Sequence, residues 1–153
     1  MNVKEEIKKI TNQNRLLIEK KYNYLNLSFD DVIMIIEDNI SNIKSYNNLS
    51  GLSRYVHYMF EIDSIIIKDI ANKFKKDENN NIDGVINIIK KYIYLSYYIA
   101  KRKQFDLERS DIKRIGEDSI INALENYDGK KLFTIHTANI IQDNLKEFQK
   151  IKK

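Results

Sequence analysis

The residues that most often perform chemistry in proteins are scarce or poorly spaced in this chain. It has no cysteine and two histidines, so thiolate nucleophiles, disulfides and cysteine–histidine metal sites have nothing to build on. His57 and His136 have no second histidine at ligand spacing. On a helix, His136 and Asp143 would lie nearly two turns apart, and no serine is placed beside them as a nucleophile.

Phosphate-binding loops and dedicated acid pairs are missing as well. The glycines stand singly instead of forming a glycine-rich loop, at Gly51, Gly84, Gly116 and Gly129. Adjacent acids such as Asp30-Asp31 usually complement the dipole at the start of a helix. The sequence therefore predicts a protein that is not an enzyme, uses no metal or cofactor, and works by binding another macromolecule.

Composition favours a helical protein. The 153 residues are 42% hydrophobic and 31% charged, with no proline and four glycines, and sheet proteins need more turn residues than this. The net charge of +4 is too mild to indicate a particular partner. No signal peptide or run of ~18 apolar residues is visible, so we expect a cytoplasmic protein that does not contact membranes.

Apolar residues recur at three- and four-residue spacing along most of the chain. Ser28 and Asp31 have the form of a capping box at a helix start. The fold class predicted is all-α, a compact bundle of about six helices. The expected helices span residues 3–24, 29–46, 52–75, 83–104, 109–127 and 132–150.

The polar stretch at 77–84 predicts a linker between two helical halves, 1–76 and 85–153. A weak internal repeat fits this division, since Asp31-Val32…Glu37-Asp38 precedes Asp111-Ile112…Glu117-Asp118 by 80 positions. In a chain this rich in isoleucine and asparagine, chance explains such a match equally well.

Four tyrosines cluster in the expected helix 83–104, and two interpretations stay open. They can be core residues plus the rim of an interface, or a platform on which bases stack. The tyrosines are Tyr92, Tyr94, Tyr97 and Tyr98.

Several short motifs follow one another between residues 85 and 148. An apolar helix ends in Ile99-Ala100-Lys101-Arg102, and Asp111-Ile112-Lys113-Arg114-Ile115-Gly116 follows. The stretch 119–128 comes next without a gap, and then Phe133-Thr134-Ile135-His136-Thr137 after a short turn. In order and spacing they resemble region 2 of bacterial sigma factors, the helical domain that docks on the RNA polymerase clamp and opens promoter DNA. The residues that carry most of the resemblance are Asp111, Gly116, Ala123, Glu125 and Asp128.

The resemblance implies that the helix 109–127 contacts the clamp of bacterial RNA polymerase. Gly116 would either allow close backbone approach of the partner or relieve crowding where two helices of this chain cross. The implied polymerase-binding residues are Asp111, Arg114, Ile115, Gly116, Glu117 and Ile121.

The resemblance is incomplete where DNA would bind. The family's melting helix carries a tyrosine and a tryptophan pair that capture flipped bases, whereas His136, Asn139 and Ile140 stand here and the chain has no tryptophan. DNA contact is therefore expected to be weak, independent promoter opening is not expected, and a second DNA-reading protein is an expected partner. If the two halves are repeats, aromatic residues of the first half would contact the bases instead. The DNA-binding candidates are Lys130, Lys131, His136, Asn139, Tyr55 and Tyr58.

Two other functions compete with the sigma-like one. The stretch Ile112-Lys113-Arg114-Ile115-Gly116-Glu117 also resembles the death-inducing helix recognised by Bcl-2-type proteins, with glutamate in place of the usual aspartate. A helical protein–protein interaction module that does not bind polymerase is the broader alternative, and it includes a viral or Bcl-2-type apoptosis regulator.

Overall fold

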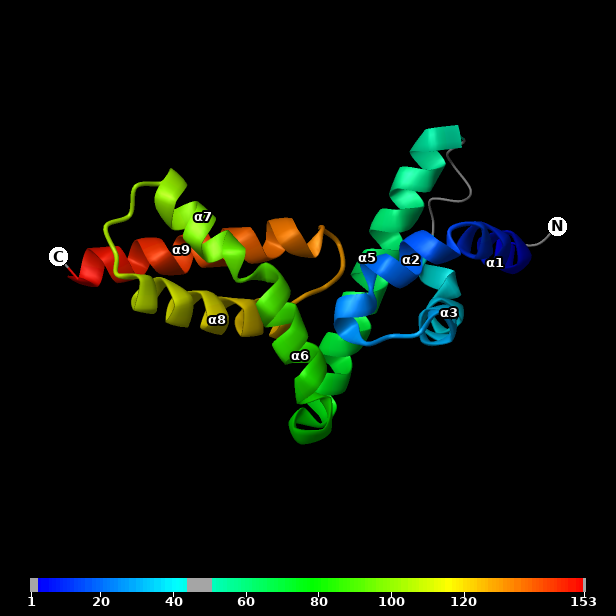
Figure 1. The fold of residues 1–153 in the computed structure, drawn as a ribbon, viewed down its shortest axis with the longest axis horizontal. Helices are drawn as coiled ribbons and strands as arrows, with labels where there is room; N and C mark the ends of the chain where they lie inside the picture. Colours follow the sequence, from blue (N-terminus) through cyan, green and yellow to red (C-terminus); the bar gives the residue numbers. More distant parts are fainter. Residues whose placement is uncertain (1–2, 44–50, 153) are drawn as a thin grey trace. The chain divides into compact units, whose positions relative to one another are not determined.

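A computed structural model describes residues 3–43 and 51–152, with the side chains of all of these except 3, 4, 6, 42 and 51–56. Within these ranges the chain forms helices and no strand, which confirms the all-α fold class. No helix in the described ranges is long and apolar enough to cross a membrane. The helices are Val3–Gln13 (α1), Arg15–Lys21 (α2), Phe29–Asp38 (α3), Gly51–Lys76 (α5), Glu78–Tyr92 (α6), Tyr94–Arg102 (α7), Arg109–Glu125 (α8) and Phe133–Lys152 (α9), with short 3₁₀ turns at Asn23–Leu25 and Ile40–Asn42 (Figure 1).

Three expected helices are interrupted or shorter than predicted. The helix expected at 3–24 breaks at Asn14, whose side-chain Nδ2 donates to the carbonyl of Ile10 at 2.8 Å. The one expected at 29–46 ends at Asp38, and Asn39 donates in the same way to Ile35 at 2.8 Å. The one expected at 83–104 is interrupted at Ile93. Asparagine side chains compete with the helix for backbone groups, which periodicity alone does not register.

The capping box at the start of α3 is confirmed. The Asp31 backbone N–H donates to Ser28 Oγ at 3.1 Å, and the Ser28 backbone N–H donates to an Asp31 carboxylate oxygen at 3.0 Å. Two backbone donors at the helix start are thereby satisfied.

The chain divides into two compact units, residues 1–69 (unit 1) and 70–153 (unit 2), with the boundary inside α5. The expected linker 77–84 is instead a helix junction. Asp77 Oδ1 accepts from the Asn80 backbone N–H at 3.3 Å and caps α6. Asn81 Nδ2 donates to the backbone carbonyls of Lys73 at 3.1 Å and Asp77 at 2.8 Å, and so supplies hydrogen-bond donors to carbonyl groups at the end of α5. The polar residues here terminate and start helices, and α6 begins at Glu78.

The two halves of the suggested repeat also differ in structure. Residues 31–42 comprise most of α3, which ends at Asp38, and a 3₁₀ turn, whereas the matching residues 111–122 belong to one unbroken helix.

Unit 1 packs α1, α2, α3 and the first part of α5 around isoleucines with two buried polar links. Tyr58 on α5 hydrogen-bonds to Thr11 on α1, and the Tyr22 hydroxyl donates to Asp63 at 3.0 Å. Its most deeply buried isoleucines are Ile7, Ile18, Ile36, Ile62, Ile66 and Ile67.

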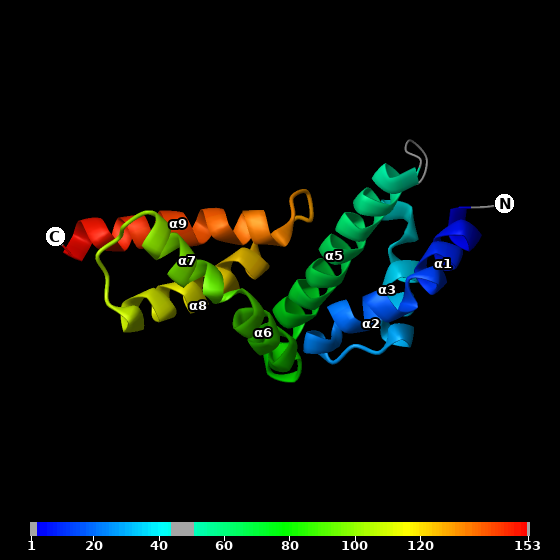
Figure 2. The same cartoon turned by 45° about the horizontal axis from the view of Figure 1, so that its top comes forward.

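Unit 2 is built on α8 and α9, which run antiparallel side by side, while α7 packs across both (Figures 1 and 2). Tyr92, Tyr127 and Phe133 form the centre, with edge-to-face ring contacts of 5.1 and 5.2 Å between centroids. Ser119 Oγ accepts from Asn144 Nδ2 at 2.9 Å and ties α8 to α9. The helix expected at 109–127 is observed as α8, and it packs against both α7 and α9.

Candidate functional site

The inner face of α8 contacts α7 through Gly116. A Cβ atom added at Gly116 would overlap Ser96 Oγ and would come within 2.8 Å of Ser96 Cβ and 2.9 Å of Ile93 Cδ1. Gly116 therefore allows α7 and α8 to cross closely, and of its two expected roles the structure shows the packing one. Ile115 is also buried, at 7% exposure. Neither residue is available to a partner while unit 2 is folded.

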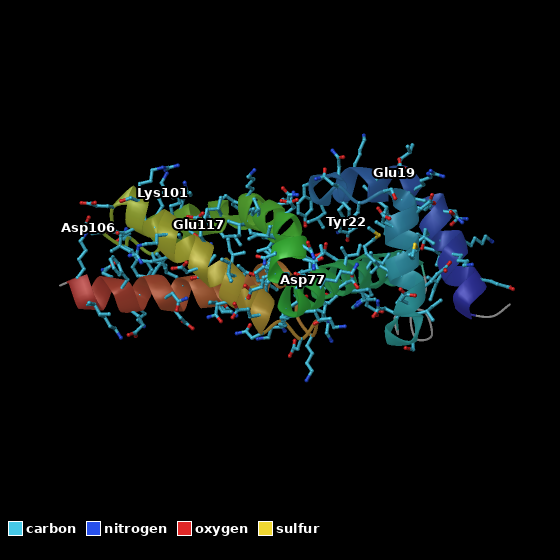
Figure 3. All side chains as sticks on the ribbon, turned by 90° about the horizontal axis from the view of Figure 1, so that it is seen from below. Glu19, Tyr22, Asp77, Lys101, Asp106 and Glu117 are labelled. Atoms are coloured by element: carbon cyan, nitrogen blue, oxygen red, sulfur yellow. The ribbon has the colours of Figure 1, made fainter. Side chains whose placement is uncertain are left out.

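The outer face of α8 carries the remaining polymerase-binding candidates. Arg114 is exposed, and its guanidinium lies 3.7 Å from Asp111 and 5.4 Å from the ring centroid of Phe148 on α9. Glu117 and Ile121 are half-buried on the same helix, and Figure 3 labels Glu117. The outer face of α8 thus presents charges of both signs, followed by one half-buried isoleucine.

His136, a DNA-binding candidate, is held between the end of α8 and the start of α9. Its Nε2 lies 2.8 Å from the Asn126 side-chain amide and 3.2 Å from the Ala123 carbonyl. Its ring lies against those of Tyr127 and Phe133, at 5.3 and 6.4 Å between centroids. These contacts give His136 a packing role at the helix junction and leave it poorly placed to stack on a base.

The turn between α8 and α9 presents cations. Lys130 and Lys131 are exposed, as is Asn139 further along α9. The turn is held by the Lys130 backbone N–H, which donates to an Asp128 carboxylate oxygen at 2.9 Å. That hydrogen bond lowers the pKa of Asp128 below its ordinary value. These residues can contact a phosphate backbone, and none of them offers a ring to a base.

The proposed transfer of the aromatic role to the first half is wrong for Tyr58. Its ring is 1% exposed in the core of unit 1, and its hydroxyl is hydrogen-bonded to Thr11. Burial raises the pKa of Tyr58 to about 12. A base cannot reach this ring in the folded protein. The side chain of Tyr55, the other candidate, lies outside the described residues.

The four tyrosines at 92–98 do not share one environment: one is buried in the core, one is half-buried and two are exposed. Tyr92 is a core residue in contact with Phe133, and Tyr97 is half-buried. Tyr94 and Tyr98 are each 55% exposed, one turn apart on α7. Periodicity could not assign each ring to the core or the surface, because four aromatics in seven positions cover every side of a helix.

The stretch that resembles a death-inducing helix turns its apolar residues inward. Ile112, Ile115 and Gly116 are all buried against other helices of unit 2. A partner with an apolar groove binds such a helix through these residues, so unit 2 would have to open before such a partner could bind.

No cluster of three or more metal-ligating side chains occurs among the described residues.

Comparisons with models of protein families, with curated proteins and with solved structures found no significant match to this chain.

Proposed function

We propose that the protein is a transcription-associated factor that binds the clamp of bacterial RNA polymerase, as a divergent or split sigma-like factor in the cytoplasm. The observation that carries the proposal is the outer face of α8, along which Asp111, Arg114, Glu117 and the half-buried Ile121 follow one another. The same helix carries the sequence motif that resembles sigma region 2.

The six implied contact residues fall into two groups with different roles in this proposal. Ile115 and Gly116 face inward, so they set the position of α8 and do not touch polymerase. Asp111, Arg114 and Glu117 are the charged groups available to a partner. A surface of mixed charge favours one orientation of a charged partner and repels the others.

DNA contact is a minor part of the proposed function. Lys130, Lys131 and Asn139 are exposed at the turn and on α9, whereas Tyr58 and His136 are engaged inside their units. Binding through lysines alone depends on counterion release and is indifferent to sequence. We therefore expect no promoter opening by the isolated protein, and opening with polymerase only when a second DNA-reading protein is present.

Co-purification tests the proposal. The tagged full-length chain, passed through a bacterial lysate at low salt, should retain the polymerase core. Glu117→Arg should release it by reversing a charge on the outer face of α8. Asp143→Arg makes the same change at an exposed position of α9 and should leave retention intact. Absence of polymerase with the unmodified chain, or equal loss with both variants, would contradict the proposal.

A second candidate function rests on unit 1. Leu16 and Leu17 on α2 and Met34 on α3 are exposed, at 76%, 48% and 62%. Exposed large apolar residues are frequent where proteins bind each other. They support a protein–protein interaction module that needs no polymerase. Paired Leu16→Ser and Met34→Ser changes that remove a captured partner, with polymerase absent from the eluate, would favour this function.

A further inference from the structure

One side of α7 is exposed and carries rings and cations together. Its other members lie one or two helical turns after Tyr94 and therefore share a face with it, while the opposite side, with Leu95, Ser96 and Ile99, is buried in unit 2. We call this the α7 face. It consists of Tyr94, Tyr98, Lys101 and Arg102.

The charge of the α7 face has a single sign. Residues 84–105 contain five basic residues and no acid, although the whole chain has a net charge of only +4. Lys101 and Arg102 are both exposed, and Lys101 is labelled in Figure 3. A concentration of this kind attracts a polyanion.

Two guanidinium groups lie beside tyrosines of α7. Arg102 Nη1 donates to the Tyr98 hydroxyl at 3.0 Å, which holds the cation next to an exposed ring. The Arg109 guanidinium, at the start of α8, lies 4.1 Å from the Tyr97 ring centroid. Arginine held in this way can pair with a phosphate and can also stack on a base.

We propose that the α7 face binds single-stranded nucleic acid. Tyr94 and Tyr98 lie about 6 Å apart along the helix axis, so each ring can stack with one of two neighbouring unpaired bases. Lys101 and Arg102 then contact the phosphates. This surface is separate from the outer face of α8 and does not depend on polymerase binding.

The composition of the face favours this ligand over other polyanions. A membrane-surface helix buries Trp, Phe or Leu side chains in the lipid, and the exposed side of α7 has none of these. An acidic peptide would be attracted to the cations but would make no particular use of two exposed rings. Every base has a flat face that stacks on tyrosine.

Fluorescence anisotropy with a labelled oligothymidine and the full-length chain tests the proposal at several salt concentrations. The double variant Tyr94→Ala/Tyr98→Ala should weaken binding at least about tenfold, because base–aromatic stacking contributes ~1–3 kcal/mol per base. Tyr94→Phe/Tyr98→Phe keeps the rings and should bind nearly as well as the unmodified chain. Circular dichroism checks that each variant stays helical.

The cations have a matched control. Lys101→Gln/Arg102→Gln should weaken binding and reduce the slope of log affinity against log salt by about 1.4, which is ~0.7 for each of two phosphates no longer neutralised. Lys146→Gln/Lys152→Gln removes the same charge from exposed positions of α9 and should change the slope little. Duplex DNA of the same length should bind more weakly than the single strand, because its bases are not free to stack.

Three results would overturn the proposal. They are no binding of oligothymidine at low salt, no effect of Tyr94→Ala/Tyr98→Ala on binding, or equal weakening of binding by Lys101→Gln/Arg102→Gln and by the control Lys146→Gln/Lys152→Gln. Binding to vesicles of phosphatidylserine and phosphatidylcholine without binding to oligothymidine would assign the face to a membrane surface instead. None of these results depends on polymerase, so a failure here is distinguishable from a failure of the proposed function.

Discussion

Gly116→Ala is the substitution that best separates a packing role of Gly116 from a partner-contact role. On an open helix surface, replacing glycine with alanine stabilises by about 1 kcal/mol, because alanine is the better helix former. At Gly116 the new methyl group would overlap Ser96 Oγ and would lie 2.9 Å from Ile93 Cδ1. Carbon atoms in contact prefer separations of roughly 3.5–4 Å. The two roles therefore predict opposite signs for the change in stability.

The magnitude follows from two opposing effects. Overpacking a helix contact costs about 1–3 kcal/mol, and close approach to both Ser96 of α7 and Ile93, which precedes α7, places this case near the upper end. Subtracting the propensity gain of about 1 kcal/mol leaves a net loss of about 2 kcal/mol in the free energy of unfolding. Urea denaturation followed by circular dichroism measures it. A gain of stability would refute the close crossing of α7 and α8.

A second substitution checks that the overlap is with Ser96. The Ser96 hydroxyl is buried without a hydrogen-bond partner in the described structure, so Ser96→Ala alone should be neutral or slightly stabilising. It also removes the atom closest to the new methyl group. The double variant should therefore recover about 1 kcal/mol relative to additivity. Strict additivity of the two changes would contradict the assigned contact.

Three further predictions concern stability. Burial raises the pKa of Tyr58 to about 12, so between pH 10 and about 12 this hydroxyl ionises in the unfolded chain but stays protonated in the folded one. The unmodified chain should therefore lose about 3 kcal/mol of its free energy of unfolding over this range, and Tyr58→Phe should abolish that loss. Denaturant titrations of both proteins at several pH values compare them, and parallel curves would contradict this expectation. Asp128→Ala should destabilise unit 2 at neutral pH, and the difference should disappear as the pH falls through the lowered pKa of Asp128; thermal melts from neutral to acid pH would show it, and a pH-independent difference would count against the hydrogen bond that holds the turn. Ser28→Ala should cost ~1 kcal/mol by removing the acceptor of the Asp31 N–H, whereas Ser41→Ala, at an exposed position outside the capping box, should cost less; equal losses in urea titrations would contradict the cap.

Much of the helical layout could be predicted because it depends on local chemistry. The spacing of Ile112, Ile115 and Ile120 predicts a helix and also predicts which side is buried. Ser28 and Asp31 predicted the start of α3 for an equally local reason.

The sequence-based predictions failed where the same residue type can serve two structural roles. Asparagine in the run 79–81 is typical of loops, but Asn81 here donates to the backbone carbonyls of Lys73 in α5 and of Asp77, so the expected linker is a helix junction. Gly116 could face a partner or a neighbouring helix, and only the position of Ser96 decides between them. Tyr58 was assigned to a surface through a suggested repeat, and its burial depends on α1, which is distant in sequence. Long-range packing of this kind leaves no mark in a single sequence.

Site-specific photo-cross-linking to purified bacterial RNA polymerase tests the proposed function most directly. A photoreactive residue at position 121, on the outer face of α8, should cross-link to the polymerase clamp. The same residue at position 135, on the exposed side of α9, is the matched control and should not. Cross-links from position 121 that map to the clamp and disappear in Glu117→Arg are the predicted result. Absence of polymerase cross-links from position 121, or equal cross-linking from position 135, would contradict the assignment of α8 as the polymerase-binding element.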